Sequence, residues 1–346
     1  GHLRRRMSVL PRSAHLIGCT RYSSSCFSIC AVPDKGLGVV AARDIARGEL
    51  ILAEAPVIDC HGDAAHWRED IRKQYELLPR DVQAEVMSLH DACVLAEEKS
   101  VEGVVFTNGI ARMPGVFDVA LCLVVSRFNH SCSPNCEQSW DETCSKAHLF
   151  ASTDIQAGEE LCSHYVDLLM PREERARELQ RRYGFTCACP SCTLEDDASD
   201  GRRLQLKRLD EEIGATGASD PADGIRMVEE AWKLLDQEGL HLCGHRRWHC
   251  CSAVEFSLLL GDERQAQAWA QRAYDCSRLS RGPEHSETLA LRGFARDPRS
   301  HPAYQARRTL RMGILFVSGA GSCIAVALLV RRGLFADLLQ HPGGDA

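Results

Sequence analysis

Cysteine thiols in two separated segments carry the clearest chemical signal in this sequence. Cys187, Cys189 and Cys192 form a C-x-C-x-x-C cluster. Because a tetrahedral zinc site needs four ligands, a fourth thiolate has to come from a distant segment. Upstream, beside an Asn-His pair, Cys132 and Cys136 are both available, and spacing alone admits either. Four thiolates leave no open coordination position, so this pattern predicts a structural zinc.

A second group of metal-binding residue types lies further along the chain. His241, His245 and His249, with Cys243, Cys250 and Cys251, have spacings that could ligate a metal. Their helical surroundings favour packed or surface side chains instead.

The composition limits the class of protein. The 346 residues have room for about two domains. A net charge of −7 argues against a general nucleic-acid binder, because neutralising phosphates requires a basic excess. The 18 cysteines, one cluster of which has metal-ligand spacing, indicate metal binding and buried free thiols in a reducing compartment rather than a disulfide framework.

Short strands joined by tight turns must position the first thiol. The turn Lys35-Gly36-Leu37-Gly38 precedes an apolar run, and strand patterns return at 119–125 and 147–151. Gly158-Glu159-Glu160-Leu161 is another turn into a strand, which ends near Tyr165. Within this β region, residues 66–98 have apolar side chains at helical spacing, which predicts a helical insert at about 60–118.

Helices dominate the rest of the chain. Residues 171–183 predict a charged helix, with proline in its first turn, that leads directly into the cysteine cluster. Residues 195–203 are acidic and contain Ser and Gly, which predicts a linker. Helical patterns follow at 204–216, 225–238, 246–260, 263–279 and 284–293. The third and fourth, joined by Gly261-Asp262, predict an antiparallel hairpin of the tetratricopeptide kind.

The two ends of the sequence are unusual. Residues 1–26 are rich in Arg and Ser and lack acidic residues, as in an organelle transit peptide or a disordered leader. Residues 312–330 carry no charge and are flanked by arginines. That length can span a bilayer as one helix, and a buried helix or hairpin is the alternative.

Four elements in order resemble the SET-domain protein lysine methyltransferases, especially the SET-and-MYND branch. They are Lys-Gly-x-Gly at 35–38, Asn-His-Ser-Cys-x-Pro-Asn at 129–135, Gly-Glu-Glu-Leu followed by Tyr165, and Tyr-x-Phe-x-Cys-x-Cys-x-x-Cys at 183–192. The resemblance covers about residues 27–195. Residues 59–118 lack the cysteine and histidine ladder of a MYND finger, so we expect a relative without that finger.

The resemblance implies an α+β fold in several parts. These are a SET domain at 27–182, built as a β-clip core of short strands with the helical insert, and a zinc-bearing post-SET segment at 183–195. A helical, tetratricopeptide-like region would follow at 202–296, and a tail at 307–346.

The resemblance also implies roles for the motif residues. S-adenosylmethionine would contact Lys35, Gly36, Leu37, Gly38, Asn129, His130, Tyr165 and Phe185. Tyr165 and Tyr183 would be the catalytic residues and line the channel for the lysine side chain. The zinc ligands would be Cys132, rather than Cys136, with Cys187, Cys189 and Cys192. We predict no general base, since His164 should face away from Tyr165 by strand alternation.

The function implied is S-adenosylmethionine-dependent N-methylation of a lysine amine in a histone or non-histone protein. A catalytically silent SET fold that binds partners through its helical region is the alternative, and the intact motifs argue against it. The expected partner is a protein or peptide bearing a lysine. We expect a monomer, no direct nucleic-acid binding, and membrane anchoring if the tail spans a bilayer. The sequence names no compartment: cytoplasm, nucleus, a membrane or an organelle all remain open.

Overall fold

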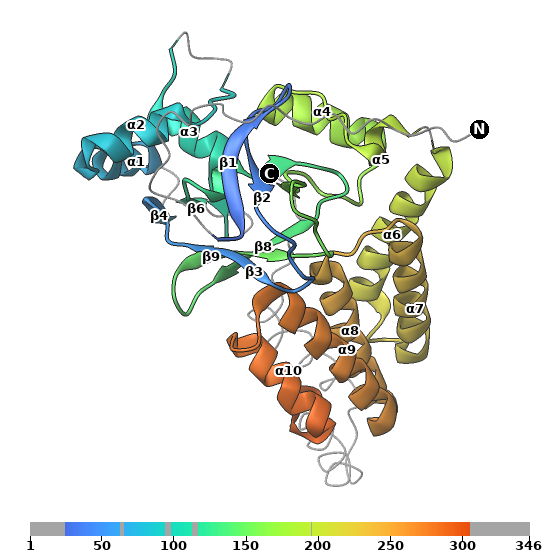
Figure 1. Cartoon of the computed structure of the whole chain (residues 1–346). Helices are drawn as coiled ribbons and strands as arrows, with labels where there is room; N and C mark the ends of the chain where they lie inside the picture. Colours follow the sequence, from blue (N-terminus) through green and yellow to red (C-terminus); the bar gives the residue numbers. More distant parts are fainter. Residues whose placement is uncertain (1–24, 63–65, 94–97, 113–116, 195, 305–346) are drawn as a thin grey trace.

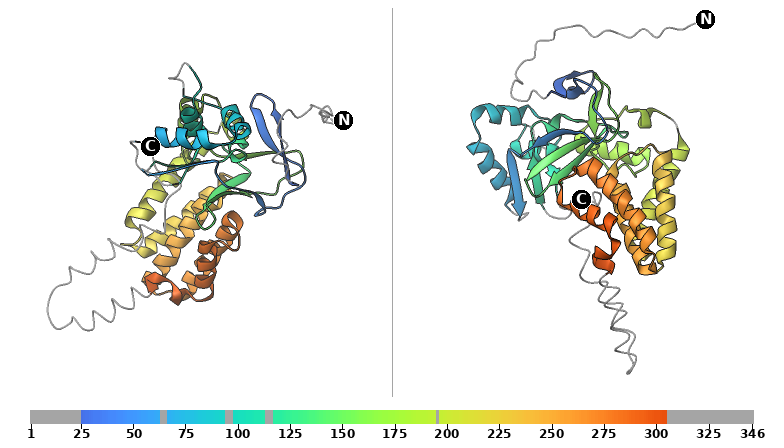
Figure 2. Two further views of the ribbon diagram at one scale, coloured as in Figure 1. Left: turned by 90° about the vertical axis from the view of Figure 1, so that its left-hand side faces the viewer. Right: turned by 60° about the horizontal axis from the view of Figure 1, so that its bottom comes forward.

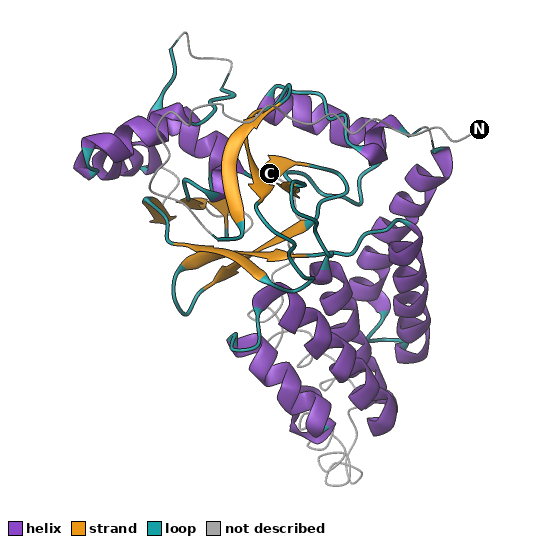
Figure 3. Cartoon of the chain, in the orientation of Figure 1, coloured by secondary structure: helices purple, strands orange, loops and turns teal. Residues whose placement is uncertain are grey.

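The computed structural model describes residues 25–62, 66–93, 98–112, 117–194 and 196–304. In these ranges the chain forms small sheets of short strands, flanked by helices (Figures 1 and 3). The insert helices and the C-terminal helices lie on different sides of the strands (Figure 2). The predicted α+β class with a helical C-terminal region is confirmed.

The first sheet gathers segments that are far apart in the sequence. Its order is β1-β2-β10-β7, with β1 at Phe27–Val32, β2 at Gly36–Ala41, β10 at Glu160–Ser163 and β7 at Asn129–His130. The β1–β2 turn contains positive φ angles at Asp34 and Gly36, which the short side chain and the glycine tolerate. Strand β7 runs parallel to β10 and pairs His130 with Ser163. The sheet therefore holds the glycine turn, the Asn-His pair and the segment before Tyr165 together.

A second sheet supports the first. Its order is β3-β9-β8, with β3 at Leu50–Glu54, β9 at Lys146–Ala151 and β8 at Cys136–Asp141. One hydrophobic cluster joins the two sheets and includes the fully buried Val39, Phe128, Leu149 and Leu161. Burial of these apolar side chains fixes the strands that carry the motif residues.

The insert contains a small sheet as well as the predicted helices. Helices α1 (Trp67–Leu77), α2 (Arg80–Ser88) and α3 (Val101–Asn108) confirm the helical prediction. Beside them lies a third sheet, ordered β4-β6-β5, with β4 at Ile58–Gly62, β6 at Phe117–Leu121 and β5 at Ile110–Ala111. The strand predicted at 119–125 overlaps β6, which ends at Leu121. The sequence did not reveal that β6 belongs to a sheet of its own, because strands of two to five residues are too short to show a clear period.

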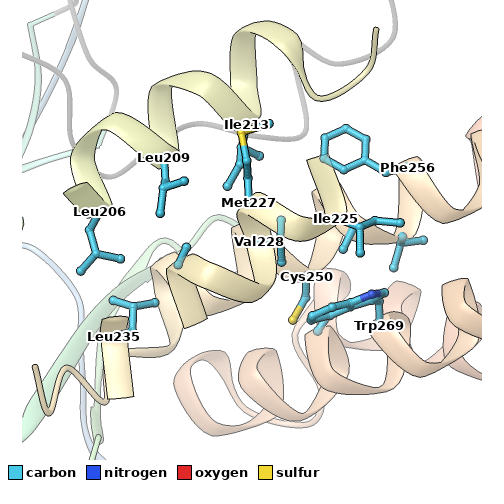
Figure 4. Packing of buried hydrophobic residues seen from close by; sticks show 14 of the residues in the cluster. Leu206, Leu209, Ile213, Ile225, Met227, Val228, Leu235, Cys250, Phe256 and Trp269 are labelled. Atoms are coloured by element: carbon cyan, nitrogen blue, oxygen red, sulfur yellow. The ribbon is translucent and has the colours of Figure 1, made fainter. Parts of the chain in front are cut away.

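Seven helices of the described chain follow β10. They are α4 (Arg172–Tyr183), α5 (Pro190–Thr193), α6 (Asp197–Thr216), α7 (Pro221–Gln237), α8 (Cys243–Leu260), α9 (Glu263–Arg281) and α10 (Ser286–Arg296). In the core of this region Val228 of α7, Cys250 of α8 and Trp269 of α9 point toward one another (Figure 4). The predicted hairpin of α8 and α9 is confirmed, with Gly261 in the left-handed conformation at its corner.

The predicted linker at 195–203 is wrong from residue 197 onward, because α6 begins there. The Asp196 side chain accepts hydrogen bonds from the backbone N–H groups of Ala198 and Ser199, which is an N-cap. Arg202 and Arg203 then pair with Glu238 at the end of α7. The polar, charged residues at the start of α6 form an N-cap and ion pairs. We interpreted this composition as that of a linker.

One buried carboxylate joins the second sheet to the helical region. Glu137 of β8 is 8% exposed and accepts hydrogen bonds from the N–H groups of Cys243 (2.7 Å) and Gly244 (2.8 Å). Leu242, at the N-cap position of α8, makes no side-chain cap. Glu137, on β8, therefore caps the N-terminus of α8. Its negative charge also interacts favourably with the positive end of the helix dipole.

We expect Glu137→Gln to lower the free energy of unfolding by about 1–3 kcal/mol, because an amide cannot accept both hydrogen bonds equally well and a buried N–H loses its partner. Urea titration of the full chain checks this. Glu76→Gln, at an exposed position on α1, is the matched control and should leave the midpoint unchanged. Equal midpoints for both variants would contradict the capping role.

Both ends of the sequence lie outside the described residues, apart from 25 and 26 of the predicted leader. The possible span at 312–330 is among the residues not described. Of the helices in the described ranges, none has the length and apolarity needed to cross a membrane.

Candidate active site and zinc centre

The four predicted zinc ligands come together. Ligand atoms of Cys132, Cys187, Cys189 and Cys192 all lie within 4.8 Å of one another, and the Sγ atoms of Cys132 and Cys192 are 3.5 Å apart. A tetrahedral zinc with Zn–S bonds of about 2.3 Å places its sulfurs about 3.8 Å apart, so the cluster fits the metal. Cys136 lies elsewhere, with its thiol donating to Asn135 Oδ1 at 3.5 Å.

The surroundings of the cluster suit thiolates. Hydrogen bonding within the cluster, which favours the protonated form of Cys132, and burial raise the pKa of this thiol, so a cation is needed for all four thiolates to form. Arg175 of α4 is 1% exposed and donates from Nε to Cys132 Sγ at 3.3 Å. The backbone N–H of Cys132 donates to Cys189 Sγ at 3.4 Å. Such outer contacts orient the ligands and offset the negative charge of a four-thiolate zinc site.

The His130 side chain connects the zinc cluster to Tyr165. Burial lowers the pKa of His130 to about 3, so its ring is neutral at physiological pH. Nδ1 accepts a hydrogen bond from the backbone N–H of Tyr165 at 3.0 Å. The ring hydrogen must then be on Nε2, which lies 3.2 Å from Cys132 Sγ and donates to it. No pattern in the sequence indicates this connection, because it depends on the register of β7 against β10.

Aromatic rings surround Tyr165. The Tyr165 ring centroid lies 4.9 Å from that of Tyr183, 5.4 Å from that of His130 and 6.4 Å from that of Phe185. Gly184, in the left-handed conformation at the end of α4, lets the chain turn between Tyr183 and Phe185. The described structure thus brings the motif aromatics from two distant segments into one cluster.

The two tyrosine hydroxyls are held by backbone carbonyls. Tyr165 donates to the carbonyl oxygen of Phe128 at 2.7 Å, and Tyr183 donates to that of Tyr165 at 3.4 Å. Burial raises the pKa of both phenols, so both stay protonated at physiological pH. A protonated, fixed phenol can orient a reacting group but cannot act as a base.

A polar group lies beside the glycine turn. Lys35 Nζ is 2.6 Å from Glu160 Oε2, and Asn129 Nδ2 donates to Glu160 Oε1 at 2.9 Å and to the Leu37 carbonyl at 3.3 Å. A Cβ atom at Gly38 would come within 2.6 Å of Asn129 Nδ2, so this close approach requires glycine. Leu37 thus contributes its backbone, while its side chain is exposed.

The residues at these two places fit S-adenosylmethionine. An ammonium, a carboxylate and an amide match the charged amino-acid end of that molecule, and the aromatic rings suit the purine. Glu160 was not among the predicted site residues. Its signal was present in Gly-Glu-Glu-Leu, which we interpreted as a turn into a strand and as part of the family resemblance, without a cofactor contact for Glu160.

The other sequence candidates lie apart from this site. His245 and His249 approach Asp210 of α6 through contacts of 3.4 and 2.5 Å, so they pack as an acid–histidine group in the helical region. Burial lowers the pKa of His164, and the charge of His245 in the helical region lowers it further. His164 therefore faces the helical region. That placement agrees with strand alternation between His164 and Tyr165.

Known proteins resemble the chain over different lengths. Residues 36–166 match the SET domain family model. The histone-lysine N-methyltransferase set5 of Schizosaccharomyces pombe is 26% identical over 290 residues, covering 81% of this chain and 86% of set5. The protein-lysine N-trimethyltransferase SMYD5 of Gallus gallus is 38% identical over 106 residues, 30% of this chain and 24% of SMYD5. The human N-lysine methyltransferase SMYD2 is 35% identical over 116 residues, 33% of this chain and 24% of SMYD2.

The similarity to set5 runs through most of both chains, whereas the matches to the SMYD proteins span about a quarter of those proteins. The SET match includes the glycine turn, Asn129, His130 and Tyr165. The chain therefore carries a SET domain at residues 36–166, and it is similar to set5 over most of its length and to the SMYD proteins over about a third of it.

Proposed function

We propose that this protein transfers the methyl group of S-adenosylmethionine to the side-chain amine of a lysine in a protein substrate. The observation that carries the proposal is the convergence of two groups on one sheet. Tyr165 with its aromatic neighbours lies just after the end of β10. Glu160 lies at the start of β10, Asn129 lies on the adjoining β7, and Lys35 lies in the turn before β2. The names of the relatives cover both histone and other protein lysines, and we propose a protein lysine in either setting.

The chemistry needs placement and electrostatics more than acid–base groups. Bound S-adenosylmethionine supplies an activated methyl group on a positively charged sulfur. A free lysine amine has a pKa of about 10.4 and is mostly protonated at pH 7. In the channel that Tyr165, Tyr183 and Phe185 would line, desolvation and repulsion by the positively charged sulfur favour loss of that proton.

We assign the residues as follows. Tyr165 and Tyr183 line the lysine channel, and the Tyr165 hydroxyl, fixed by the Phe128 carbonyl, orients the reacting groups. Phe185 and the backbone at His130 hold the adenine. Lys35, Asn129 and the backbone at 36–38 hold the amino-acid end, where we add Glu160 as the partner of its ammonium group.

We expect Glu160→Gln to weaken S-adenosylmethionine binding by about 10- to 100-fold, because a charge-assisted hydrogen bond contributes about 1.5–3 kcal/mol. Isothermal titration of wild type and variant measures the change. Methylthioadenosine, which lacks the amino-acid end, is the control ligand and should bind both proteins alike. Equal loss for both ligands would show that Glu160 supports the fold of the site rather than the ammonium.

Incubation of the purified chain with methyl-labelled S-adenosylmethionine and a cell lysate tests the proposal. We expect label in one or a few protein bands. If the chain binds no cofactor and labels no band, the enzyme proposal is lost. The silent-scaffold alternative then gains support if partner capture survives deletion of residues 27–195.

A further inference from the structure

We propose that the tip of the β8–β9 hairpin is a second metal site, with Asp141, Cys144 and His148 as ligands for Zn²⁺. It is separate from the four-cysteine cluster, and none of its residues belongs to the motifs described above. The proposal does not depend on the methyltransferase activity.

The register of the hairpin places the three side chains together. Asp141 pairs with Lys146 and Ser139 pairs with His148, so Asp141 and His148 project from the same face of the hairpin. Ser145 adopts a positive φ of 51°, and the turn between the strands brings Cys144 back over that face. One ligand atom of each residue lies within 4.8 Å of the other two, and Cys144 Sγ is 3.9 Å from His148 Nε2.

The ligand atoms are available. His148 Nδ1 is buried and has no hydrogen-bond partner among the described residues, and its Nε2 meets only the weak acceptor Cys144 Sγ. Asp141 Oδ1 accepts the backbone N–H of Thr143 at 2.8 Å, and the carboxylate also contacts the side chains of Thr143 and Cys144, which fixes it beside Cys144. A metal bound at Nε2 would replace this weak contact with a strong one.

The ligand types select the metal. Carboxylate, thiolate and imidazole together suit zinc, at distances of about 2.0–2.3 Å. The carboxylate of Asp141 and the thiolate of Cys144 neutralise a divalent cation, whereas the positive charge of the nearby Lys146 repels it. We therefore expect weaker binding than at the four-cysteine cluster. Cys144 is exposed, so a fourth position stays open to solvent.

The position suggests what the metal does. On the same hairpin, Ser139 Oγ donates to the carbonyl of Ser280 in α9 at 3.1 Å, and Phe150 lies against Gly282. The charge of His285, just before α10, acts on Asp141. A metal at the hairpin tip would stiffen the hairpin where the second sheet meets the helical region.

Metal content of the full chain tests the site. The protein is loaded with Zn²⁺, freed of loosely bound metal on a desalting column and measured by elemental mass spectrometry. We expect two equivalents for wild type and one for Cys144→Ser and for His148→Ala. Cys93→Ser, a partly buried thiol of the insert, is the matched control and should keep two. Co²⁺ added to protein that carries a single zinc equivalent, at the four-cysteine cluster, should give a thiolate charge-transfer band that Cys144→Ser abolishes.

An equal metal content in wild type, Cys144→Ser and His148→Ala would overturn the proposal, because any second ion would then be adventitious. Thermal unfolding at matched zinc separates this from misfolding. A variant that lost metal only because it unfolded would also lose the tight equivalent at the four-cysteine cluster.

Discussion

Tyr165→Phe should lower the rate of methyl transfer by about 10²- to 10³-fold, the usual cost of removing one oriented polar group from an active site. The hydroxyl is held at 2.7 Å by the Phe128 carbonyl within the aromatic cluster, so its position is set before any substrate binds. The ring, its packing and the contact of its backbone with His130 all survive the substitution. We therefore expect cofactor affinity within a few-fold of wild type.

Single-turnover transfer of labelled methyl, with cofactor affinity measured in parallel, checks this expectation. Tyr183→Phe is the matched control, because its hydroxyl lies farther from the Tyr165 carbonyl, at 3.4 Å, and should matter less. Loss of the Tyr165 hydroxyl leaves the Phe128 carbonyl unpaired, at a cost of about 1–3 kcal/mol in stability. A Tyr165→Phe variant that melts normally and transfers methyl at the wild-type rate would refute the assignment.

Removing the zinc should disable the cofactor site and the lysine channel together. Structural zinc contributes an apparent binding free energy of about 10–16 kcal/mol, which is as large as the stability of a whole domain. Cys189 lies just before α5 and Cys192 lies within it. This helix follows Tyr183 and Phe185 closely in the chain. Cys132 also receives the His130 hydrogen bond that leads to the Tyr165 backbone. Loss of the metal therefore loosens both sides of the site at once.

We expect Cys192→Ser, or exhaustive chelation, to weaken S-adenosylmethionine binding at least tenfold and to make the post-SET segment sensitive to protease. Cys136→Ser is the control: its thiol is buried outside the cluster and should not affect zinc content. A zinc-free sample with full cofactor affinity would contradict the link from Cys132 through His130 to Tyr165.

Much of the site could be predicted because its residues have fixed spacing and distinct chemistry. The C-x-C-x-x-C run predicted a metal site, and the family resemblance favoured Cys132 over Cys136 as the fourth ligand. What escaped prediction depends on strand pairing. The ring of His130 meets Cys132 and the Tyr165 backbone only because β7 lies parallel to β10. Glu160 reaches Lys35 across the sheet from 125 residues away.

The fold shows the same division. Helices with clear periodicity, such as α7 and α9, were predictable, since each repeats its apolar face over several turns. The third sheet was not, because its strands are short. The start of α6 was misjudged because an aspartate N-cap has the composition of a loop. Contacts such as Glu137 with the N-terminus of α8 join residues 106 and 107 apart and leave no local signal.

The identity of the methylated residue is the most direct test of the proposed function. Proteins labelled by the wild-type chain are hydrolysed, and the labelled amino acid is identified by chromatography and mass spectrometry, with Tyr165→Phe run beside it. We predict label in N-methylated lysine with wild type and almost none with the variant. Label in another amino acid, or equal labelling by both proteins, would contradict the proposed function.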